Sequence, residues 1–148
     1  MAVPAMRKAG VLPTEIELTV PFHDVDLVQV VWHGHYVKYF ENARWALMER
    51  IGFGLEAMLA SGFGWPVVEL QARYLKHTSF GDRLRVRASL VEWENRLTIN
   101  YLVTNVGTGD RVARAMTVQV AVAMTTGELQ FVSPEPLLER VRKALGEG

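Results

Sequence analysis

Two acidic residues and two histidines lie close together near the start of the chain, and residues of these types can support hydrolysis. Asp24 and Asp26 end an alternating segment, and His33-Gly34-His35 directly precedes a pattern typical of a helix. The start of a helix presents backbone N–H groups without partners inside the helix and the positive end of the helix dipole. A carboxylate facing such donors can attack a substrate or activate water while the N–H groups bind an oxyanion. Asp26 is therefore a candidate catalytic residue, with turn capping as its alternative role.

The same stretch contains enough ligand atoms for a metal ion. His23, Asp24, Asp26, His33 and His35 supply imidazole and carboxylate groups, which divalent ions accept as ligands. Their spacing does not match a defined zinc motif, and the chain has no cysteine. We therefore expect no metal site.

The elements that hold these residues follow from the hydrophobic pattern. A loose arm is expected over residues 1–13, followed by a strand that begins at Thr14. A helix over Gly34–Ile51 is predicted because apolar side chains recur on one stripe at helical spacing. That stripe consists of Tyr36, Phe40, Ala43 and Leu47. A short helix over 54–61 and a C-terminal helix over 134–145 are also expected.

Four further strands are predicted in the second half of the chain. They cover residues 65–80, 83–94, 97–103 and 111–125. In the last of them, Val118 is expected to face inward and Gln119 outward. Hairpin-length connections predict an antiparallel sheet, and the long helix is the element whose stripe can cover its apolar face. The expected fold class is α+β, with a sheet of about five strands wrapped around one long helix.

The composition bounds the class of protein. The 148 residues include 16 basic and 16 acidic side chains, so the formal net charge is zero, and 49% of the residues are hydrophobic. These values are typical of one globular domain, here expected over residues 14–148, and provide no overall attraction to nucleic acid. No stretch approaches the roughly 18 uninterrupted apolar residues of a membrane span, and no signal peptide is recognisable. We therefore expect a cytoplasmic protein that binds no nucleic acid and has no membrane span.

The motif around the candidate residues resembles that of a known enzyme family. It consists of Phe22-x-Asp24-x-Asp26, Val30-Val31-Trp32-His33, His35-Tyr36 and Phe40-Glu41-x-Ala43-Arg44. These segments resemble the 4-hydroxybenzoyl-CoA thioesterase family, and in particular its branch of YbgC-like bacterial acyl-CoA thioesterases. The resemblance implies the hotdog fold, which agrees with the order of strands and helices predicted above.

The resemblance also implies roles for individual residues and for partners. Asp26 matches the family's catalytic carboxylate, a nucleophile or general base, and the backbone N–H of His33 matches the group that binds the thioester oxygen. The side chain of His33 is then an auxiliary. The implied substrate is an acyl- or aroyl-thioester of coenzyme A, or of acyl carrier protein. Family members need no metal and no bound cofactor, and they form homodimers or homotetramers with active sites at the subunit interface.

Five other residues are candidate contacts of the substrate. Gly34 would permit close approach of the substrate or of a neighbouring chain, and Tyr36 is one of several aromatic residues that could line an acyl site. Arg83, Arg85 and Arg87 form a positive stripe on one strand face. This stripe could bind the phosphates of coenzyme A, or it could be a solvated face of the sheet.

Two residues of the loop before the helix carry further expectations. Asp24 is expected to fix the loop, and in an extended segment it would point the same way as Asp26. Gln29 stands where the family usually has glycine, three residues after the catalytic acid. A residue other than glycine argues against a positive φ at this position.

Two other functions stay open at this point. Hotdog dehydratases and hydratases combine a helix acid of one subunit with a histidine of the other, so Glu41 with His33 is an alternative catalytic pair. A non-catalytic acyl-thioester-binding module is the second alternative. A carboxylate at Asp26 beside a helix start argues against such a module.

Overall fold

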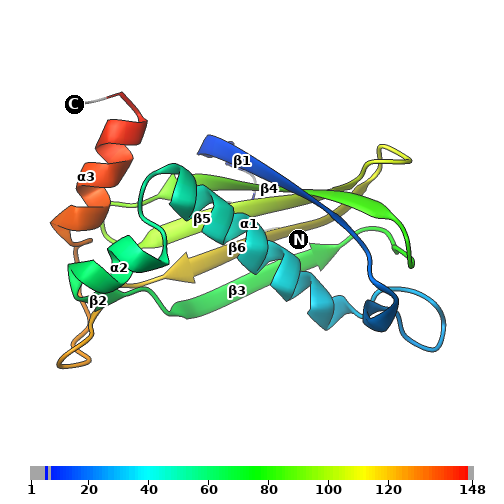
Figure 1. Cartoon of the computed structure of the whole chain (residues 1–148), viewed down its shortest axis with the longest axis horizontal. Helices are drawn as coiled ribbons and strands as arrows, with labels where there is room; N and C mark the ends of the chain where they lie inside the picture. The colour runs from blue at the N-terminus through cyan, green and yellow to red at the C-terminus, as the bar shows by residue number, and fades with distance from the viewer. Residues whose placement is uncertain (1–5, 7, 147–148) are drawn as a thin grey trace.

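The chain folds into an antiparallel sheet that lies against one long helix (Figure 1). The computed structural model describes residue 6 and residues 8–146. Its helices and strands are β1 (Val11–Thr19), α1 (Tyr36–Arg50), α2 (Leu55–Ser61), β2 (Phe63–Gly64), β3 (Val67–Tyr74), β4 (Arg83–Glu92), β5 (Leu97–Asn105), β6 (Arg111–Gln119), β7 (Val122–Ala123) and α3 (Glu135–Ala144). Two 3-10 turns, η2 (Phe22–Asp24) and η3 (His33–His35), lie between β1 and α1. Among the helices in the described part of the chain, none is long and apolar enough to cross a membrane.

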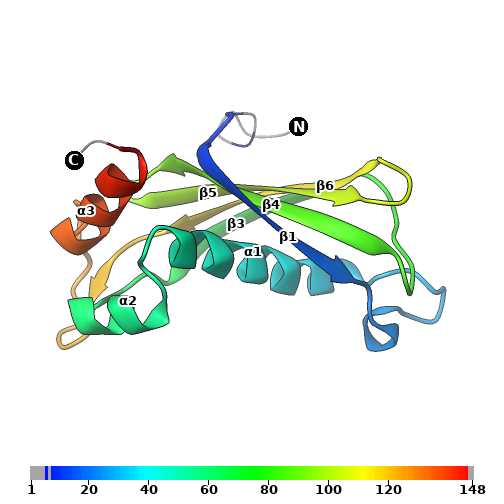
Figure 2. The same cartoon turned by 45° about the horizontal axis from the view of Figure 1, so that its top comes forward.

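The five-stranded sheet has the order β1-β4-β5-β6-β3, and each neighbouring pair is antiparallel. β1 and β3 are therefore its edge strands. α1 contacts β1, β4 and β5, and Figure 2 shows this helix lying along one face of the sheet. This is the hotdog arrangement that the resemblance implied, so the predicted fold class is confirmed.

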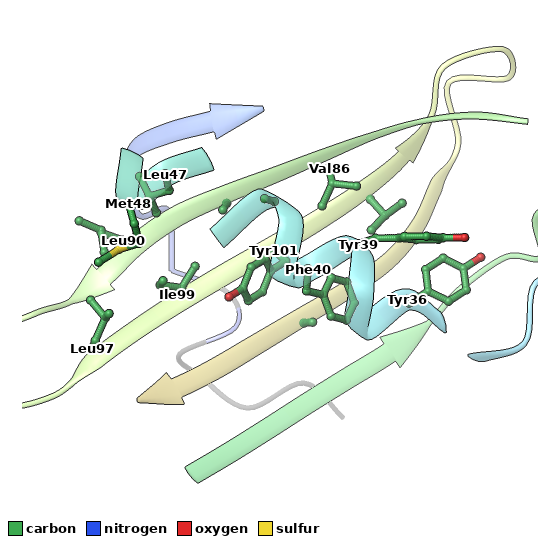
Figure 3. Packing of buried hydrophobic residues seen from close by; sticks show 14 of the residues in the cluster. Tyr36, Tyr39, Phe40, Leu47, Met48, Val86, Leu90, Leu97, Ile99 and Tyr101 are labelled. Atoms are coloured by element: carbon green, nitrogen blue, oxygen red, sulfur yellow. The ribbon is translucent and has the colours of Figure 1, made fainter. Parts of the chain in front are cut away.

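The apolar stripe of α1 forms the centre of the core. Phe40 is 1% exposed and Leu47 is fully buried. Figure 3 shows Phe40 beside Tyr101 of β5, and their ring centroids lie 5.2 Å apart. Burying each large apolar side chain of this kind contributes roughly 1.5–3 kcal/mol. This packing fixes the start of α1 relative to the strands that surround the candidate site.

β1 begins at Val11, earlier than the predicted Thr14. Val11 pairs with Leu90 of β4, and a register shift separates this pair from the regular ladder that begins at Thr14. Leu12 has a φ of 54° within that irregular part. Pro13 favoured a loop on sequence grounds, but proline is tolerated in an edge strand beside a bulge. The rest of the expected arm includes residues 1–5 and 7, which lie outside the described residues.

The two faces of β6 are the reverse of those predicted. Gln119 is fully buried on the side of α1, where its Nε2 donates to Oγ1 of Thr117 at 2.7 Å. Val118 points to the opposite face and packs in a small cluster with Met6 and Met116. The prediction assigned the faces from the apolar residues after position 118, as if one strand continued to residue 125. It was wrong because β6 ends at Gln119 and side-chain alternation does not continue into β7.

Candidate active site

A pocket of about 340 Å³ lies where the loop after β1, the start of α1 and the end of β3 meet. We call it the aromatic pocket, and its lining residues are Asp26, Val30, Val31, Trp32, His33, Tyr36, Tyr74, Lys76 and His77. Three of the predicted site residues, Asp26, His33 and Tyr36, therefore share one pocket. Gly34 and the three predicted arginines do not line it.

The loop that carries Asp26 is a tight hairpin. Asp26 N donates to the carbonyl of Val30, and Gln29 N donates to the carbonyl of Asp26, each at 2.9 Å. A three-residue hairpin loop of this kind commonly ends in a residue with left-handed backbone geometry. Gln29 occupies that position with a φ of 66°. The expectation that a non-glycine would avoid a positive φ is therefore wrong, because the hairpin imposes the conformation.

One carboxylate oxygen of Asp26 is engaged and the other is open. Oδ1 accepts the backbone N–H of Val28 at 2.9 Å, so the side chain does cap the turn. Oδ2 makes no hydrogen bond to any residue that the structure describes, and the side chain is exposed. Asp26 also borders a second hollow of about 730 Å³, which we call the apolar hollow because it is lined by side chains such as Phe22, Leu27 and Phe80. Asp26 therefore borders both the aromatic pocket and the apolar hollow.

The long helix begins with a 3-10 turn. His33–His35 forms this turn and α1 follows from Tyr36, whereas the prediction started the helix at Gly34. The amides of His33 and Gly34 are the first of the turn, and the first amides of a helix have no carbonyl partner within it. Tyr74 at the end of β3 donates its hydroxyl hydrogen to the His33 carbonyl at 2.9 Å, which ties the turn to the sheet.

Contacts within its own loop explain why glycine occupies position 34. A Cβ at this position would lie 2.3 Å from Cζ3 of Trp32, which is far too close for two carbon atoms. The indole of Trp32 also packs against the imidazole of His33, with ring centroids 5.1 Å apart. Gly34 therefore lets Trp32 lie flat over the turn, and its contact with a substrate or a neighbouring chain stays a prediction.

Three residues around the aromatic pocket were not recognised in the sequence, namely Tyr74, His77 and Thr78. The hydroxyl of Tyr36 shares a hydrogen bond of 2.6 Å with Oγ1 of Thr78. Burial raises the pKa of Tyr36, so its phenol stays neutral near pH 7. The predicted strand over residues 65–80 hid this loop, because β3 already ends at Tyr74. The polar run from Lys76 to Ser79 was the available signal for a loop.

Asp24 points into the protein, not along the same direction as Asp26. Its side chain is 1% exposed, and it accepts hydrogen bonds from Lys38 Nζ at 2.7 Å and from the hydroxyl of Tyr39 at 2.6 Å. Burial alone would raise the pKa of Asp24, but these hydrogen bonds and the charge of Lys38 bring it below its ordinary value. The contacts fasten the loop to α1, in agreement with the expected loop-fixing role. The direction differs from the prediction because the segment is a 3-10 turn and not extended.

The histidines beside Asp24 do not complete a metal-binding group. Nε2 of His23 and Nδ1 of His35 lie 3.7 Å and 3.6 Å from Oδ1 of Asp24. Within residue 6 and residues 8–146, no group of three or more histidine or carboxylate side chains is arranged to hold a metal ion.

The predicted arginine stripe lies on the face of the sheet that points away from α1, here called the outer face. Leu84 and Val86 of β4 are buried toward α1, so the alternate residues of this strand face outward. Arg83 and Arg85 pair with Glu17 of β1 at 2.5 Å and 3.2 Å. The structure therefore does not bring them together with Asp26, and Arg87 of the same face lines a different pocket.

Comparison with known proteins identifies relatives over most of the chain. A family model described as the Thioesterase-like superfamily matches residues 20–145. The 1,4-dihydroxy-2-naphthoyl-CoA hydrolase of Thermosynechococcus vestitus is 30% identical over 125 residues, which cover 83% of this chain and 84% of that protein.

Solved structures share the same fold. The 1,4-dihydroxy-2-naphthoyl-CoA thioesterase of Synechocystis matches with a TM-score of 0.77 and 21% identity, covering 87% of this chain and 95% of that one. The DHNA-CoA thioesterase of Staphylococcus aureus matches with a TM-score of 0.80 and 20% identity, covering 91% and 89% of the two chains.

Proposed function

The chain belongs to the Thioesterase-like superfamily, and from this membership we propose that it hydrolyses the thioester bond of an acyl- or aroyl-CoA substrate with Asp26 as the essential carboxylate. The observation that carries the proposal is the open oxygen of Asp26 at a pocket that also holds the start of the helical turn at His33. A carboxylate, and the amide of a residue at the start of a helical turn, beside one pocket provide both groups that acyl transfer requires.

The chemistry can follow two routes from this arrangement. In the first, Oδ2 of Asp26 attacks the thioester carbon, the C–S bond breaks, and water then hydrolyses the resulting anhydride. In the second, Asp26 accepts a proton from a water molecule that attacks the same carbon, and the departing thiolate takes up a proton. In both routes the amide of His33 donates to the oxygen on which negative charge develops, and the His33 imidazole helps to orient the thioester.

We propose an aromatic acyl group as the preferred substrate class. Trp32, Tyr36, Tyr74 and His77 surround the aromatic pocket, and flat rings stack well against such side chains. The name of the relative from Thermosynechococcus vestitus, a hydrolase of a dihydroxynaphthoyl thioester, supports the same class. The motif over residues 22–44 further supports membership of the YbgC-like branch, and thioesters of acyl carrier protein remain within the proposal.

We further propose that two copies of the chain pair through β3 and complete each active site, as a homodimer or as part of a homotetramer. β3 is an edge strand whose Val67, Val68 and Leu70 are 40%, 58% and 41% exposed. An apolar edge strand of this kind is a template for pairing with a second chain. Tyr74, the last residue of β3, lines the aromatic pocket, so a partner on this edge would lie next to the site.

The dehydratase alternative has weaker support. Its helix acid, Glu41, pairs with Arg44 of the same helix at 2.7 Å. The open carboxylate beside the aromatic pocket is the group of Asp26, which favours hydrolysis.

A panel of thioesters tests the proposed function. Free-thiol release would be measured with benzoyl-, hydroxybenzoyl-, naphthoyl-, short-chain and long-chain acyl-CoA, and with the matching acyl carrier protein thioesters. We expect rapid release from aromatic CoA thioesters, with kcat/KM about fivefold or more above that for aliphatic ones, because ring stacking contributes on the order of 1 kcal/mol. Release from no member of the panel would contradict the proposed function, and a preference for long aliphatic chains would contradict the proposed substrate class.

A further inference from the structure

A second pocket, of about 320 Å³, lies on the outer face of the sheet. The residues just before β1 form one of its walls, and strands β4, β5 and β6 form its floor. It shares no lining residue with the aromatic pocket or with the apolar hollow. It is therefore a separate site, on the opposite side of the sheet from α1.

Four cationic side chains line this outer pocket, namely Lys8, Arg87, Arg111 and Arg114. In the part of the chain that the structure describes, none of them has a carboxylate within salt-bridge distance. Two other arginines of the same face, on β4, are paired with Glu15 and Glu17. The pocket thus brings together four cations that are not neutralised by a neighbouring carboxylate.

The strand register places two of these cations, and a further arginine of β3, in one row across the sheet. Leu102 of β5 pairs with Arg87 on one side and with Arg114 on the other. Arg114 in turn pairs directly with Arg73 of β3. Like charges opposite each other on neighbouring strands are destabilising. Because the chain as a whole has no net charge, this excess of positive charge is local to the outer face and favours the binding of an anion there.

The wall of the outer pocket is fastened to the sheet. Nδ2 of Asn100 donates to the carbonyl of Lys8 at 2.9 Å, and Met6 is buried against Met116. Gly10 approaches so closely that a Cβ on it would lie 2.5 Å from the carbonyl oxygen of Leu90. The backbone that carries Lys8 is thus held over the arginines of β4 and β6.

We propose that the outer pocket is a binding site for a ligand with two or more closely spaced phosphates. Guanidinium groups match phosphate oxygens with paired hydrogen bonds, and three arginines with one lysine neutralise about three to four negative charges. The volume fits a small ligand or the phosphorylated end of a larger one. Two sources share this chemistry: the 3′-phosphorylated ADP end of coenzyme A, and a free diphosphate or nucleotide. The proposal does not rest on the thioesterase function.

Isothermal titration calorimetry with inorganic pyrophosphate at low ionic strength tests the site directly. We expect saturable binding of one pyrophosphate per chain. Arg114→Gln should weaken this binding at least about tenfold, because it removes hydrogen bonds to a charged group. Arg114→Lys should weaken it less, since it keeps the charge and loses the planar fork. Arg83→Gln is the matched control, because Arg83 lies on the same face of the sheet but is already paired with Glu17. This variant should leave pyrophosphate binding unchanged.

Competition distinguishes the two sources. If coenzyme A displaces pyrophosphate but dephospho-coenzyme A does so much more weakly, the site holds the nucleotide end of the substrate. If pyrophosphate or ATP binds there and coenzyme A does not displace it, the site belongs to a separate phosphorylated ligand. Absence of saturable pyrophosphate binding would overturn the proposal, and so would an equal loss of binding in Arg83→Gln and Arg114→Gln, which would indicate diffuse surface charge. Circular dichroism melting of each variant confirms that it is folded.

Discussion

In Asp26, a turn-capping role that the structure shows coincides with the catalytic role that we propose. Oδ1 caps the hairpin turn through the N–H of Val28, and this bond fixes the direction of Oδ2. The capping role and the catalytic role were competing interpretations of the sequence, and the geometry allows both. A residue held in this way needs no reorganisation before it meets a substrate, which favours catalysis.

Gln29 carries strain that glycine would relieve. Its φ of 66° lies in the left-handed region, which costs a residue with a Cβ roughly 1–2 kcal/mol. We expect Gln29→Gly to raise the free energy of unfolding by up to about 1 kcal/mol, because the gain is offset by the greater freedom of glycine in the unfolded chain. Urea denaturation measures the change. Gln29→Ala keeps the strain and should bring no such gain, and a destabilised glycine variant would show that the side chain of Gln29 makes a needed contact.

Asp24 should make stability depend on pH in the acid range. Its folded-state pKa lies below the ordinary 3.8, so its charged form stabilises the fold at pH values above 3.8, and this contribution is lost as the pH falls through the lowered pKa. We expect Asp24→Asn to lower the free energy of unfolding by about 1–3 kcal/mol at pH 7. The difference between wild type and variant should shrink at pH 3 and below. Urea denaturation at both pH values measures this difference. A difference in free energy of unfolding that stayed constant or grew at pH 3 would contradict the prediction.

The regular elements were predictable where one face of an element is uniformly apolar. The stripe of α1, with Phe40 and Leu47, and the alternation of β4 both appear in the structure as predicted. The start of α1 was misplaced because a 3-10 turn and an α-helix leave similar local patterns. β6 was reversed because its buried face includes the polar Gln119, whose amide is satisfied by Thr117 inside the core.

The candidate site was predictable only in part, for a related reason. Asp26 and His33 belong to one local segment with a recognisable motif. Tyr74 and His77 reach the same pocket through tertiary structure, at the end of a strand that was predicted to be longer than it is. The separation of the outer-face arginines from Asp26 likewise depends on tertiary structure. Strand alternation shows that these arginines share one face of the sheet, but it does not show whether the loop of Asp26 lies on the same side.

The contact between α1 and the sheet should dominate stability at the level of elements. Phe40 lies at its centre against Tyr101. We expect Phe40→Ala to lower the free energy of unfolding by about 3–5 kcal/mol, because it leaves a cavity in a packed core. Leu59→Ala on α2, where Leu59 is 57% exposed, should change it by less than about 0.5 kcal/mol. Chemical denaturation of both variants checks the contrast, and equal effects would contradict this view of the core.

At the scale of the whole molecule, the two edges and two faces of the sheet have different characters. β1 carries Glu15 and Glu17, which pair with arginines of β4, so this edge is polar. β3 presents apolar side chains on the opposite edge, beside the aromatic pocket. The outer face carries uncompensated cations, and the inner face is covered by α1. The fold thus places the proposed catalytic region, the proposed pairing edge and the proposed anion-binding face on different parts of the sheet.

Pairing through β3 predicts that assembly and activity are lost together. Val68→Lys places a charge on the exposed edge strand and should convert the oligomer to monomer. We expect kcat/KM for the best thioester to fall at least about tenfold with it, because the active site would lose the wall supplied by its partner. Light scattering after size-exclusion chromatography and thiol release measure the two effects. Leu59→Lys on α2 is the control, and a fully active Val68→Lys monomer would contradict the proposed interface.

The most direct test of the central claim is thiol release by Asp26→Asn, measured beside Asp82→Asn. Both carboxylates accept a backbone N–H at 2.9 Å in a turn, but Asp82 lines neither the aromatic pocket nor the apolar hollow. If Asp26 is the essential carboxylate, Asp26→Asn should lose at least about 100-fold in kcat while remaining folded, and Asp82→Asn should keep its activity. A folded Asp26→Asn protein that releases thiol at the wild-type rate would show that hydrolysis does not depend on Asp26.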